Sequence, residues 1–258
     1  MKKLLFIINP MAGRQQAQTD LYKMVKIFAD HDYEVTVYPT RARLDCTRKV
    51  LEDAGRFDLV VCCGGDGTLN EMVSGMMQRQ DRRPMGYIPL GSTNDLAVSL
   101  RLPTRVEEAA LRAVTGNEFH MDVGTLNDRY FNYIAAFGAF TETSYATPQE
   151  IKNALGHLAY ILEGVKSLGK ILPIHVKITA DDEQFEEDYL FGAVTNTISL
   201  GGVLKLDPEK VLLDDGMYEL LLVKNPTNAL EAQAMLTAIM TQNFDGPLVK
   251  MFHASDIT

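Results

Sequence analysis

The feature that most constrains this chain is a glycine-rich turn at residues 64–71, which reads Gly-Gly-Asp-Gly-Thr-Leu-Asn-Glu. It directly follows the apolar run Leu59–Cys63, so we expect a buried strand to end where the glycines begin. Glycines remove side chains from the tip of the strand, and a helix that begins there turns its backbone N–H groups toward an anion. An ordinary capped turn explains one or two glycines, but not three with an aspartate among them. The turn therefore predicts a phosphate site.

Asp66 lies in the middle of this predicted anion site. A carboxylate repels a phosphate, so phosphate binding alone does not account for it. An acidic group is explained if the site also needs a divalent cation or a positioned proton, as phosphoryl transfer does. We therefore predict that Asp66 is a catalytic residue.

Strand and helix patterns alternate through the first half of the chain. The predicted strands are Lys3–Asn9, Tyr33–Tyr38, Asp58–Cys63 and Met85–Pro89, and the predicted helices are Gln16–Ala29, Ala42–Ala54, Thr68–Gln78, one from Leu96, and Val106–Val114. Such alternation predicts an α/β domain whose parallel sheet is covered on both faces. Ligands of these sheets bind at the carboxyl ends of the strands, where Asn9, Thr40, Gly64 and Gly91 are expected to meet.

The pattern changes near residue 122, which we take as the boundary between a first domain at 1–122 and a second at 123–258. Strand-like segments now dominate, namely His120–Leu126, Tyr130–Ala136, Ile174–Thr179, Glu187–Asn196 and Tyr218–Val223. Two helical stretches, Gln149–Leu168 and Asn228–Thr241, interrupt them. This half is predicted to be a mainly antiparallel β domain that carries helices.

Composition excludes several classes of function. The net charge of −9 argues against nucleic-acid binding and against simple electrostatic adsorption to an acidic membrane. No apolar run reaches the length of about 18 residues that a transmembrane helix needs. The three cysteines have neither disulfide nor metal-site spacing, which suits a reducing cytosol.

Five motifs, in order, carry a family resemblance. They are Asn9–Arg14, Gly64–Glu71, Pro89–Ala97, Leu155–Tyr160 and Leu213–Tyr218. Together they resemble the bacterial diacylglycerol kinase family of lipid kinases, which is related to the sphingosine kinases and more distantly to the NAD kinases. The resemblance implies an α/β nucleotide domain, a β-sandwich domain after it, and ATP bound in the cleft between the two.

The resemblance also implies a set of ligand residues. Ser92 stands where the family usually has threonine, and the hydroxyl is kept. Asp215 resembles a structural Mg²⁺ ligand, joined by the backbone carbonyls of Leu212 and Met217, although Asp214–Gly216 is equally compatible with a plain hairpin turn. The implied ATP-binding residues are Asn9, Gly13, Arg14, Thr40, Gly64, Gly65, Asp66, Gly67, Thr68, Leu69, Asn70, Ser92, Asn94 and Asp95.

The end of the chain departs from the family pattern. Members of the family continue beyond a segment like Phe252–Thr258 into an Asp-Gly-Glu motif, whose acidic residue is proposed to take the proton of the lipid hydroxyl. The look-alike at 245–247, Asp-Gly-Pro, precedes the final strand and lacks the glutamate. The expectation is a chain shortened at its C-terminal end, with a natural pseudo-kinase as the other interpretation.

The function predicted is an ATP- and Mg²⁺-dependent lipid kinase that phosphorylates a hydroxyl of diacylglycerol or a related lipid. One alternative is an NAD kinase, which shares the Gly-Gly-Asp-Gly turn, but the Asn9–Gly13 start and the Asn94-Asp95 pair argue against it. The other is a non-catalytic protein that binds nucleotide or lipid, motivated by the missing acidic motif. We expect a cytoplasmic protein that meets its lipid at the inner face of the membrane; the sequence leaves open whether it forms a homodimer.

Overall fold

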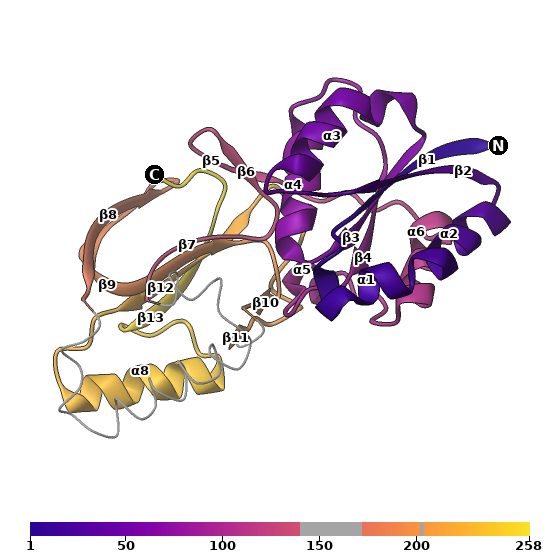
Figure 1. Ribbon diagram of the computed structural model, residues 1–258. Helices are drawn as coiled ribbons and strands as arrows, with labels where there is room; N and C mark the ends of the chain where they lie inside the picture. The colour runs from indigo at the N-terminus through magenta and orange to yellow at the C-terminus, as the bar shows by residue number, and fades with distance from the viewer. Residues whose placement is uncertain (140–171, 202–203) are drawn as a thin grey trace. The chain divides into compact units, whose positions relative to one another are not determined.

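The computed structural model describes residues 1–139, 172–201 and 204–258 (Figure 1). The chain divides into two compact units, Met1–Asn132 and Tyr133–Thr258. The boundary predicted at residue 122 lies before a hairpin of two short strands, β5 (Gly124–Leu126) and β6 (Arg129–Phe131), which the structure groups with the first unit. The two units are described separately below.

A four-stranded parallel sheet forms the centre of the first unit. Its strands are β1 (Lys2–Ile8), β2 (Tyr33–Pro39), β3 (Leu59–Gly64) and β4 (Met85–Pro89), in the order β2-β1-β3-β4. All six residues of β3 are buried, as a strand covered on both faces requires. The predicted α/β class and all four predicted strands are confirmed.

Helices cover both faces of this sheet (Figure 1). One face carries α2 (Leu21–Asp30) and α6 (Val106–Thr115), whose apolar side chains form one core with β1. In that core the rings of Phe6 and Phe28 meet edge to face, with centroids 5.2 Å apart. The other helices of this unit are α1 (Gln16–Thr19), α3 (Asp45–Asp53), α4 (Asp66–Met77), α5 (Asp95–Ser99) and the short 3₁₀ helices Ala12–Gln15 and Ala54–Arg56.

Two predicted helices have different bounds in the structure. The helix predicted over Gln16–Ala29 breaks at Asp20, whose carboxylate accepts a hydrogen bond from Gln16 Nε2 (3.1 Å) and pairs with Lys23 (2.8 Å). The helix predicted from Ala42 begins only at Asp45. Leu44 before it has a left-handed backbone (φ 64°) and donates its N–H to Glu71 Oε1 (2.8 Å).

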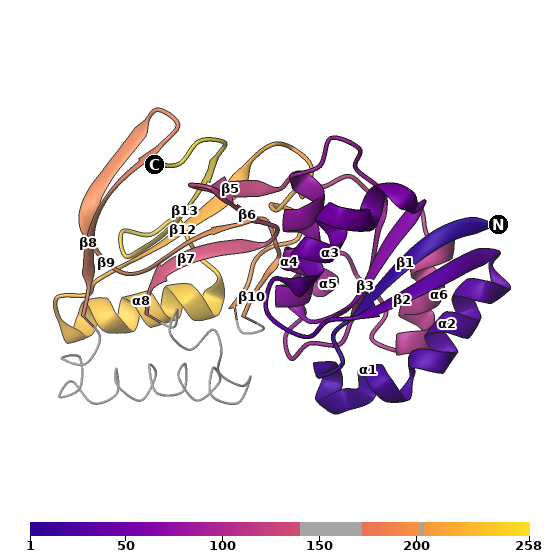
Figure 2. The ribbon, with the colours of Figure 1, turned by 45° about the horizontal axis from the view of Figure 1, so that its top comes forward.

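The second unit is built on a five-stranded antiparallel sheet with the order β13-β12-β9-β7, in which β8 also pairs with β9 (Figure 2). The strands are β7 (Ile134–Gly138), β8 (Ile174–Ala180), β9 (Glu183–Thr195), β12 (Tyr218–Lys224) and β13 (Val249–Ala254), and a small separate pair is formed by β10 (Ser199–Leu200) and β11 (Leu204–Lys205). Both faces of β12 are buried, Leu221 and Val223 on one and Leu220 and Leu222 on the other. This confirms the predicted antiparallel domain.

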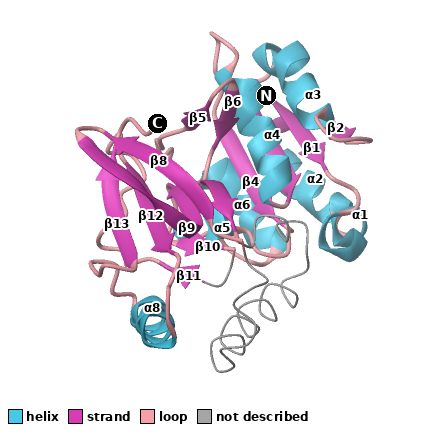
Figure 3. Cartoon of the chain, turned by 90° about the vertical axis from the view of Figure 1, so that its left-hand side faces the viewer, coloured by secondary structure: helices cyan, strands magenta, loops and turns pink. Residues whose placement is uncertain are grey.

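The helix α8 (Ala229–Thr241) belongs to the second unit and is seen end-on below β12 and β13 in Figure 3. Its Met235 is fully buried in the apolar cluster that contains Leu221. The predicted helix Gln149–Leu168 and the motif Leu155–Tyr160 lie outside the described residues. Within the described ranges, no helix is both long and apolar enough to cross a membrane.

We expect Asn228→Ala to destabilise the protein by about 1 kcal/mol, since it removes the N-terminal cap of α8. Asn228 Oδ1 accepts the N–H of Glu231 (3.0 Å), and Glu231 Oε2 accepts the N–H of Thr227 (2.7 Å). Urea unfolding measures the change, with the exposed Gln233→Ala on the same helix as control. Equal midpoints for Asn228→Ala and the wild type would show that the cap contributes nothing.

Candidate phosphoryl-transfer site

The loops that leave the parallel strands are joined by backbone hydrogen bonds at one edge of the sheet. The N–H of Asn9 donates to Cys63 O (2.9 Å), the N–H of Thr40 to Ile8 O (2.9 Å), and the N–H of Leu90 to Gly64 O (2.8 Å). Each bond ties the start of one loop to the end of a neighbouring strand. The predicted convergence of polar and glycine residues at this edge is therefore found in the first unit.

Two of these loops touch through glycines. A Cβ atom placed on Gly91 would lie 2.5 Å from the Cα of Gly65 and 2.6 Å from Asn94 Oδ1. A Cβ atom on Gly65 would lie 3.0 Å from the Cα of Gly91. The neighbouring atom is glycine backbone in both cases, so a side chain at Gly91 would clash and one at Gly65 would push the other loop back by a few tenths of an ångström. These glycines let the loop after β3 and the loop after β4 pack against each other.

Gly67 has a different surrounding. It lies in the first turn of α4, and a Cβ atom placed on it would meet nothing within 4 Å. The space in front of the helix N-terminus is therefore open at this residue. An open, side-chain-free helix N-terminus is the geometry in which backbone N–H groups approach a phosphate. The predicted anion cradle fits this arrangement.

Asp66 begins α4 beside this open space. Its Oδ1 is buried and has no hydrogen-bonding partner among the residues that the structure describes. Burial, with a smaller contribution from the Asp95 carboxylate, raises the pKa of Asp66 to about 6, although the backbone N–H groups of Asn94 and Leu96 oppose the shift. A buried carboxylate with a raised pKa and a free oxygen can accept a proton near neutral pH or bind a cation.

Asn94 is predicted to contact the nucleotide, but its side chain makes its hydrogen bonds to nearby residues of the chain. Its Oδ1 accepts the N–H of Gly91 (2.7 Å) and the hydroxyl of Tyr87 (3.1 Å), and its Nδ2 donates to Gly91 O (2.9 Å). These bonds hold the loop after β4, and Asn94 itself has a left-handed backbone (φ 54°). The neighbouring Asp95 is buried and begins α5, while Ser92 is exposed.

A pocket of about 240 Å³ opens in the first unit next to this edge. Three residues predicted from the sequence line it: Asn9, Thr40 and Thr68. Asn9 Nδ2 donates to Thr68 Oγ1 (3.4 Å), which links the first loop to α4. The remaining lining residues, which the sequence did not indicate as ligands, are Pro10, Met11, Arg41, Ala42, Arg43 and Glu71.

Glu71 fixes one wall of this pocket. Its carboxylate accepts the N–H groups of Leu44 (2.8 Å) and Cys46 (3.3 Å), and its carbonyl accepts the hydroxyl of Thr47 (2.8 Å). It thereby ties α4 to the segment that carries Thr40 and both arginines. The glutamate ends the glycine-rich motif, but nothing local in the sequence shows which backbone it would bind.

We expect Glu71→Ala to destabilise the protein by about 1–3 kcal/mol, because it leaves the exposed N–H of Leu44 and the part-buried N–H of Cys46 without their charged acceptor. Hydrogen exchange at the amides of Leu44 and Cys46 should accelerate, and Glu71→Gln, which keeps one amide oxygen, should recover part of both losses. The exposed Glu34→Ala is the control. Unchanged exchange at both amides in Glu71→Ala would contradict this assignment.

The other predicted ligands are placed as follows. Gly13 has a left-handed backbone (φ 60°), and the side chain of Arg14 lies outside what the structure describes. Leu212, Asp215 and Met217 lie in the turn before β12, where Asp215 Oδ1 accepts the N–H of Met217 (2.9 Å). Searched across the described ranges, the chain holds no cluster of three or more His, Cys, Asp or Glu side chains suited to a metal. One carboxylate with backbone carbonyls still offers the oxygen donors that Mg²⁺ takes.

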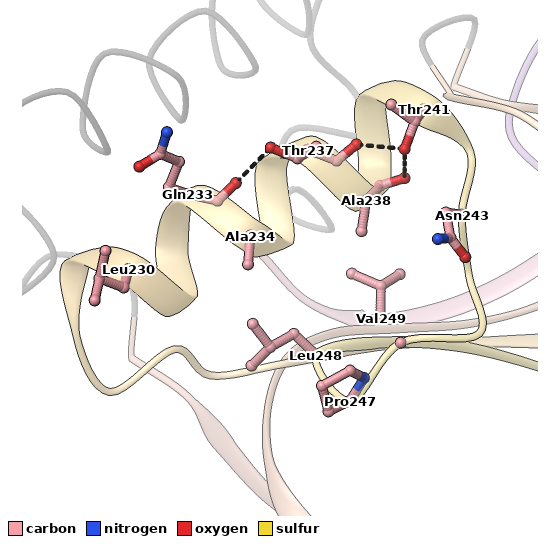
Figure 4. Close-up of a pocket in the computed structure, with 11 residues that line it drawn as sticks. Leu230, Gln233, Ala234, Thr237, Ala238, Thr241, Asn243, Pro247, Leu248 and Val249 are labelled. Carbon is pink, nitrogen blue, oxygen red and sulfur yellow. Dashed lines mark hydrogen bonds between the residues drawn. The ribbon is translucent and has the colours of Figure 1, made fainter.

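A larger pocket, of about 480 Å³, lies in the second unit between α8 and the segment 243–249 (Figure 4). Its lining is apolar or neutral, with side chains such as Leu230, Thr237 and Leu248. None of the predicted site residues lines it. It has no group that could move a proton, so its size does not make it the reaction site.

The chain is similar to known diacylglycerol kinases. The family described as "Diacylglycerol kinase catalytic domain" matches residues 3–126. The chain is 37% identical over 226 residues to the diacylglycerol kinase of Bacillus subtilis (strain 168), covering 87% of this chain and 74% of that protein. It is 31% identical over 258 residues to the diacylglycerol kinase of Staphylococcus saprophyticus subsp. saprophyticus, covering 100% of this chain and 84% of that protein.

A solved structure is also similar over nearly the whole chain. The crystal structure of a diacylglycerol kinase from Bacillus anthracis str. Sterne superposes with a TM-score of 0.74 at 25% sequence identity, covering 99% of this chain and 85% of that chain. The sequence relatives, the matched catalytic domain and the shared fold lead to one conclusion: this chain belongs to the diacylglycerol kinase family.

Proposed function

We propose that this protein is an ATP- and Mg²⁺-dependent lipid kinase that transfers the γ-phosphoryl group to a hydroxyl of diacylglycerol or a related lipid. The observation that carries the proposal is the buried, unpartnered carboxylate oxygen of Asp66 at the open N-terminus of α4. The family supports lipid phosphorylation in general. The use of ATP, the requirement for Mg²⁺ and the choice of diacylglycerol as the lipid are parts of the proposal that go beyond the family match.

The residues at the sheet edge divide the work. The backbone N–H groups at Gly67 and Thr68 hold phosphate oxygens, and Asn9, Thr40 and Thr68 line the pocket for the rest of the nucleotide. Arg14 is proposed to offset charge that develops on the phosphate. ATP supplies the phosphoryl group. Asp66 takes the proton of the acceptor hydroxyl while the hydroxyl oxygen bonds to the γ-phosphorus. The bond between the γ-phosphorus and the β–γ bridging oxygen breaks, which releases ADP.

Mg²⁺ would be held by oxygen donors of the chain. The proposed structural site uses the Asp215 carboxylate and the backbone carbonyls of Leu212 and Met217, which lie together in the turn before β12. Asp215 Oδ1 already accepts a backbone N–H, so the second carboxylate oxygen is the one left for an ion. Calorimetric titration with Mg²⁺, comparing the wild type with Asp215→Asn, tests this site.

The proposed lipid substrate implies that the enzyme acts at a membrane. Diacylglycerol is held in a bilayer by its acyl chains, so the enzyme would act at a membrane surface from the cytoplasm. The net charge of −9 indicates that adsorption to acidic lipid is not the means of recruitment.

The test is a phosphoryl-transfer assay on the purified chain with labelled ATP. Parallel reactions contain diacylglycerol in mixed micelles, NAD, or no acceptor, each with Mg²⁺ and with EDTA. The proposal predicts Mg²⁺-dependent labelling of diacylglycerol alone. Labelling of NAD would identify an NAD kinase, and ATP binding by titration without any labelled product would identify a non-catalytic nucleotide-binding protein.

A further inference from the structure

Asn132 is a fully buried polar residue that the sequence analysis did not single out. It follows β6 directly, and its side chain has no exposed surface. Neither Nδ2 nor Oδ1 has a hydrogen-bonding partner within the described part of the chain. A carboxamide offers two N–H donors and one carbonyl acceptor, and burying all of them unpaired costs free energy. An orphaned group of this kind calls for an occupant.

Asn132 is anchored beside the proposed reaction site. Its backbone N–H donates to Asn70 Oδ1 (3.2 Å), and Asn70 lies on α4. Asn70 stands four residues after Asp66, and side chains with this spacing share one face of a helix. The backbone of Asn132 is thus anchored one turn of α4 away from Asp66, and each of the two residues carries a buried side-chain group without a partner.

The chemistry of these two groups selects the kind of ligand. Asp66 Oδ1 accepts a hydrogen bond and carries negative charge when ionised, so a phosphate oxygen, which is itself an acceptor, does not suit it. Asn132 Nδ2 donates. An alcohol hydroxyl is both donor and acceptor, so it can give its proton to Asp66 and accept an N–H from Asn132.

We infer that the Asn132 carboxamide binds the acceptor hydroxyl of the lipid substrate and directs its proton toward Asp66. The inference rests on the proposed function, whose acceptor it specifies: the ligand is an alcohol rather than a second phosphate. Asn132 is therefore a substrate-binding residue, distinct from the residues that hold the nucleotide.

The test uses Asn132→Leu, which keeps the approximate volume of the side chain and removes its hydrogen-bonding atoms. If Asn132 serves a ligand, the variant folds with a melting temperature equal to or above that of the wild type, because an unpaired buried amide is gone. The catalytic efficiency, kcat/KM, for diacylglycerol falls by about 10- to 100-fold, as the loss of one hydrogen bond to a reacting group predicts, while the Kd for ATP stays unchanged. Asp128→Asn, at the exposed turn of the same hairpin, leaves all three quantities unchanged.

Binding is measured apart from turnover, through the thermal shift produced by dioctanoylglycerol with a non-hydrolysable ATP analogue. The melting temperature of the wild type should rise with this ligand and that of Asn132→Leu should not. This result does not depend on turnover, so a failure of the proposed kinase activity can be told apart from a failure of the proposed hydroxyl binding. Equal shifts and equal kcat/KM in both would overturn the inference and leave a buried water as the occupant. A loss of ATP affinity would overturn it by placing Asn132 on the nucleotide side. A lower melting temperature with unchanged kinetics would show a purely structural role.

Discussion

Asp66→Asn is expected to lower the rate of phosphoryl transfer by about 10²–10⁴-fold, the usual effect of removing a general base. The substitution keeps the size of the side chain but leaves it unable to take the proton of the acceptor hydroxyl. ATP affinity should change little, since the backbone of α4 holds the phosphate. The measurement is kcat and the Kd for ATP at saturating lipid.

The same substitution should stabilise the folded protein above pH 6. The pKa of Asp66 is raised from its ordinary value of 3.8 to about 6, so between these values the folded chain binds more protons than the unfolded chain. Wild-type stability therefore falls as the pH rises through this window. An asparagine does not ionise and avoids the loss, which is about 3 kcal/mol at pH 8 and falls below about 1 kcal/mol at pH 4.

Asp182→Asn in the exposed turn between β8 and β9 is the matched control, and it should change neither rate nor stability. Chemical denaturation at pH 4 and pH 8 measures the stability difference. Wild-type turnover by Asp66→Asn would remove Asp66 from the chemistry. A variant less stable than the wild type at pH 8 would show that the carboxylate supports the fold.

Two glycine substitutions should have opposite effects on stability and the same effect on nucleotide binding. Gly91→Ala forces a Cβ atom against the backbone at Gly65, and overpacking of this kind costs about 1–3 kcal/mol. Gly67→Ala meets open space in the first turn of α4, so it should stabilise the helix by up to about 1 kcal/mol. Both should weaken ATP binding, the first by displacing a loop and the second by filling the place of a phosphate oxygen.

Thermal unfolding and titration of a fluorescent ATP analogue separate the two mechanisms. Gly216→Ala is not a suitable control because Gly216 has a left-handed backbone. Ala109→Gly on α6 is used instead, since it should lower the stability without changing ATP affinity. Full ATP affinity in the stabilised Gly67→Ala variant would place the phosphates elsewhere. A Gly91→Ala variant as stable as the wild type would mean that the two loops are free to separate.

The sheet and its site edge could be predicted because their signals are local. The apolar run of β3 and the glycines after it stand next to each other in the sequence, and alternating strands and helices imply parallel pairing. The late start of α3 could not be predicted, because the Glu71 carboxylate that binds the Leu44 N–H is 27 residues away, and no signal in the sequence marks the break at Asp20. The predicted strand Tyr130–Ala136 is two strands, β6 and β7, separated by Asn132 and Tyr133.

The candidate site shows the same limit. Gly64 to Asn70 could be found from their motif, and the structure brings them beside Asn9 and Thr40. Glu71 and Asn132 could not be assigned, since their roles depend on groups 27 and 62 residues away, at Leu44 and Asn70. A single glutamate or asparagine has no spacing that reports a distant partner.

The glycine contact between Gly65 and Gly91 has a consequence for recombining this protein with its relatives. The two loops contact each other through backbone atoms, so a larger residue in one loop requires the other loop to move away. For recombination they therefore form one block that is best taken from a single parent. A chimera that takes residues 60–70 from one parent and 86–96 from another would combine surfaces shaped for different counterparts. Crossover points placed before β3 or between the two units take both loops from one parent, so chimeras cut there should retain nucleotide binding more often than those cut at residues 70–86.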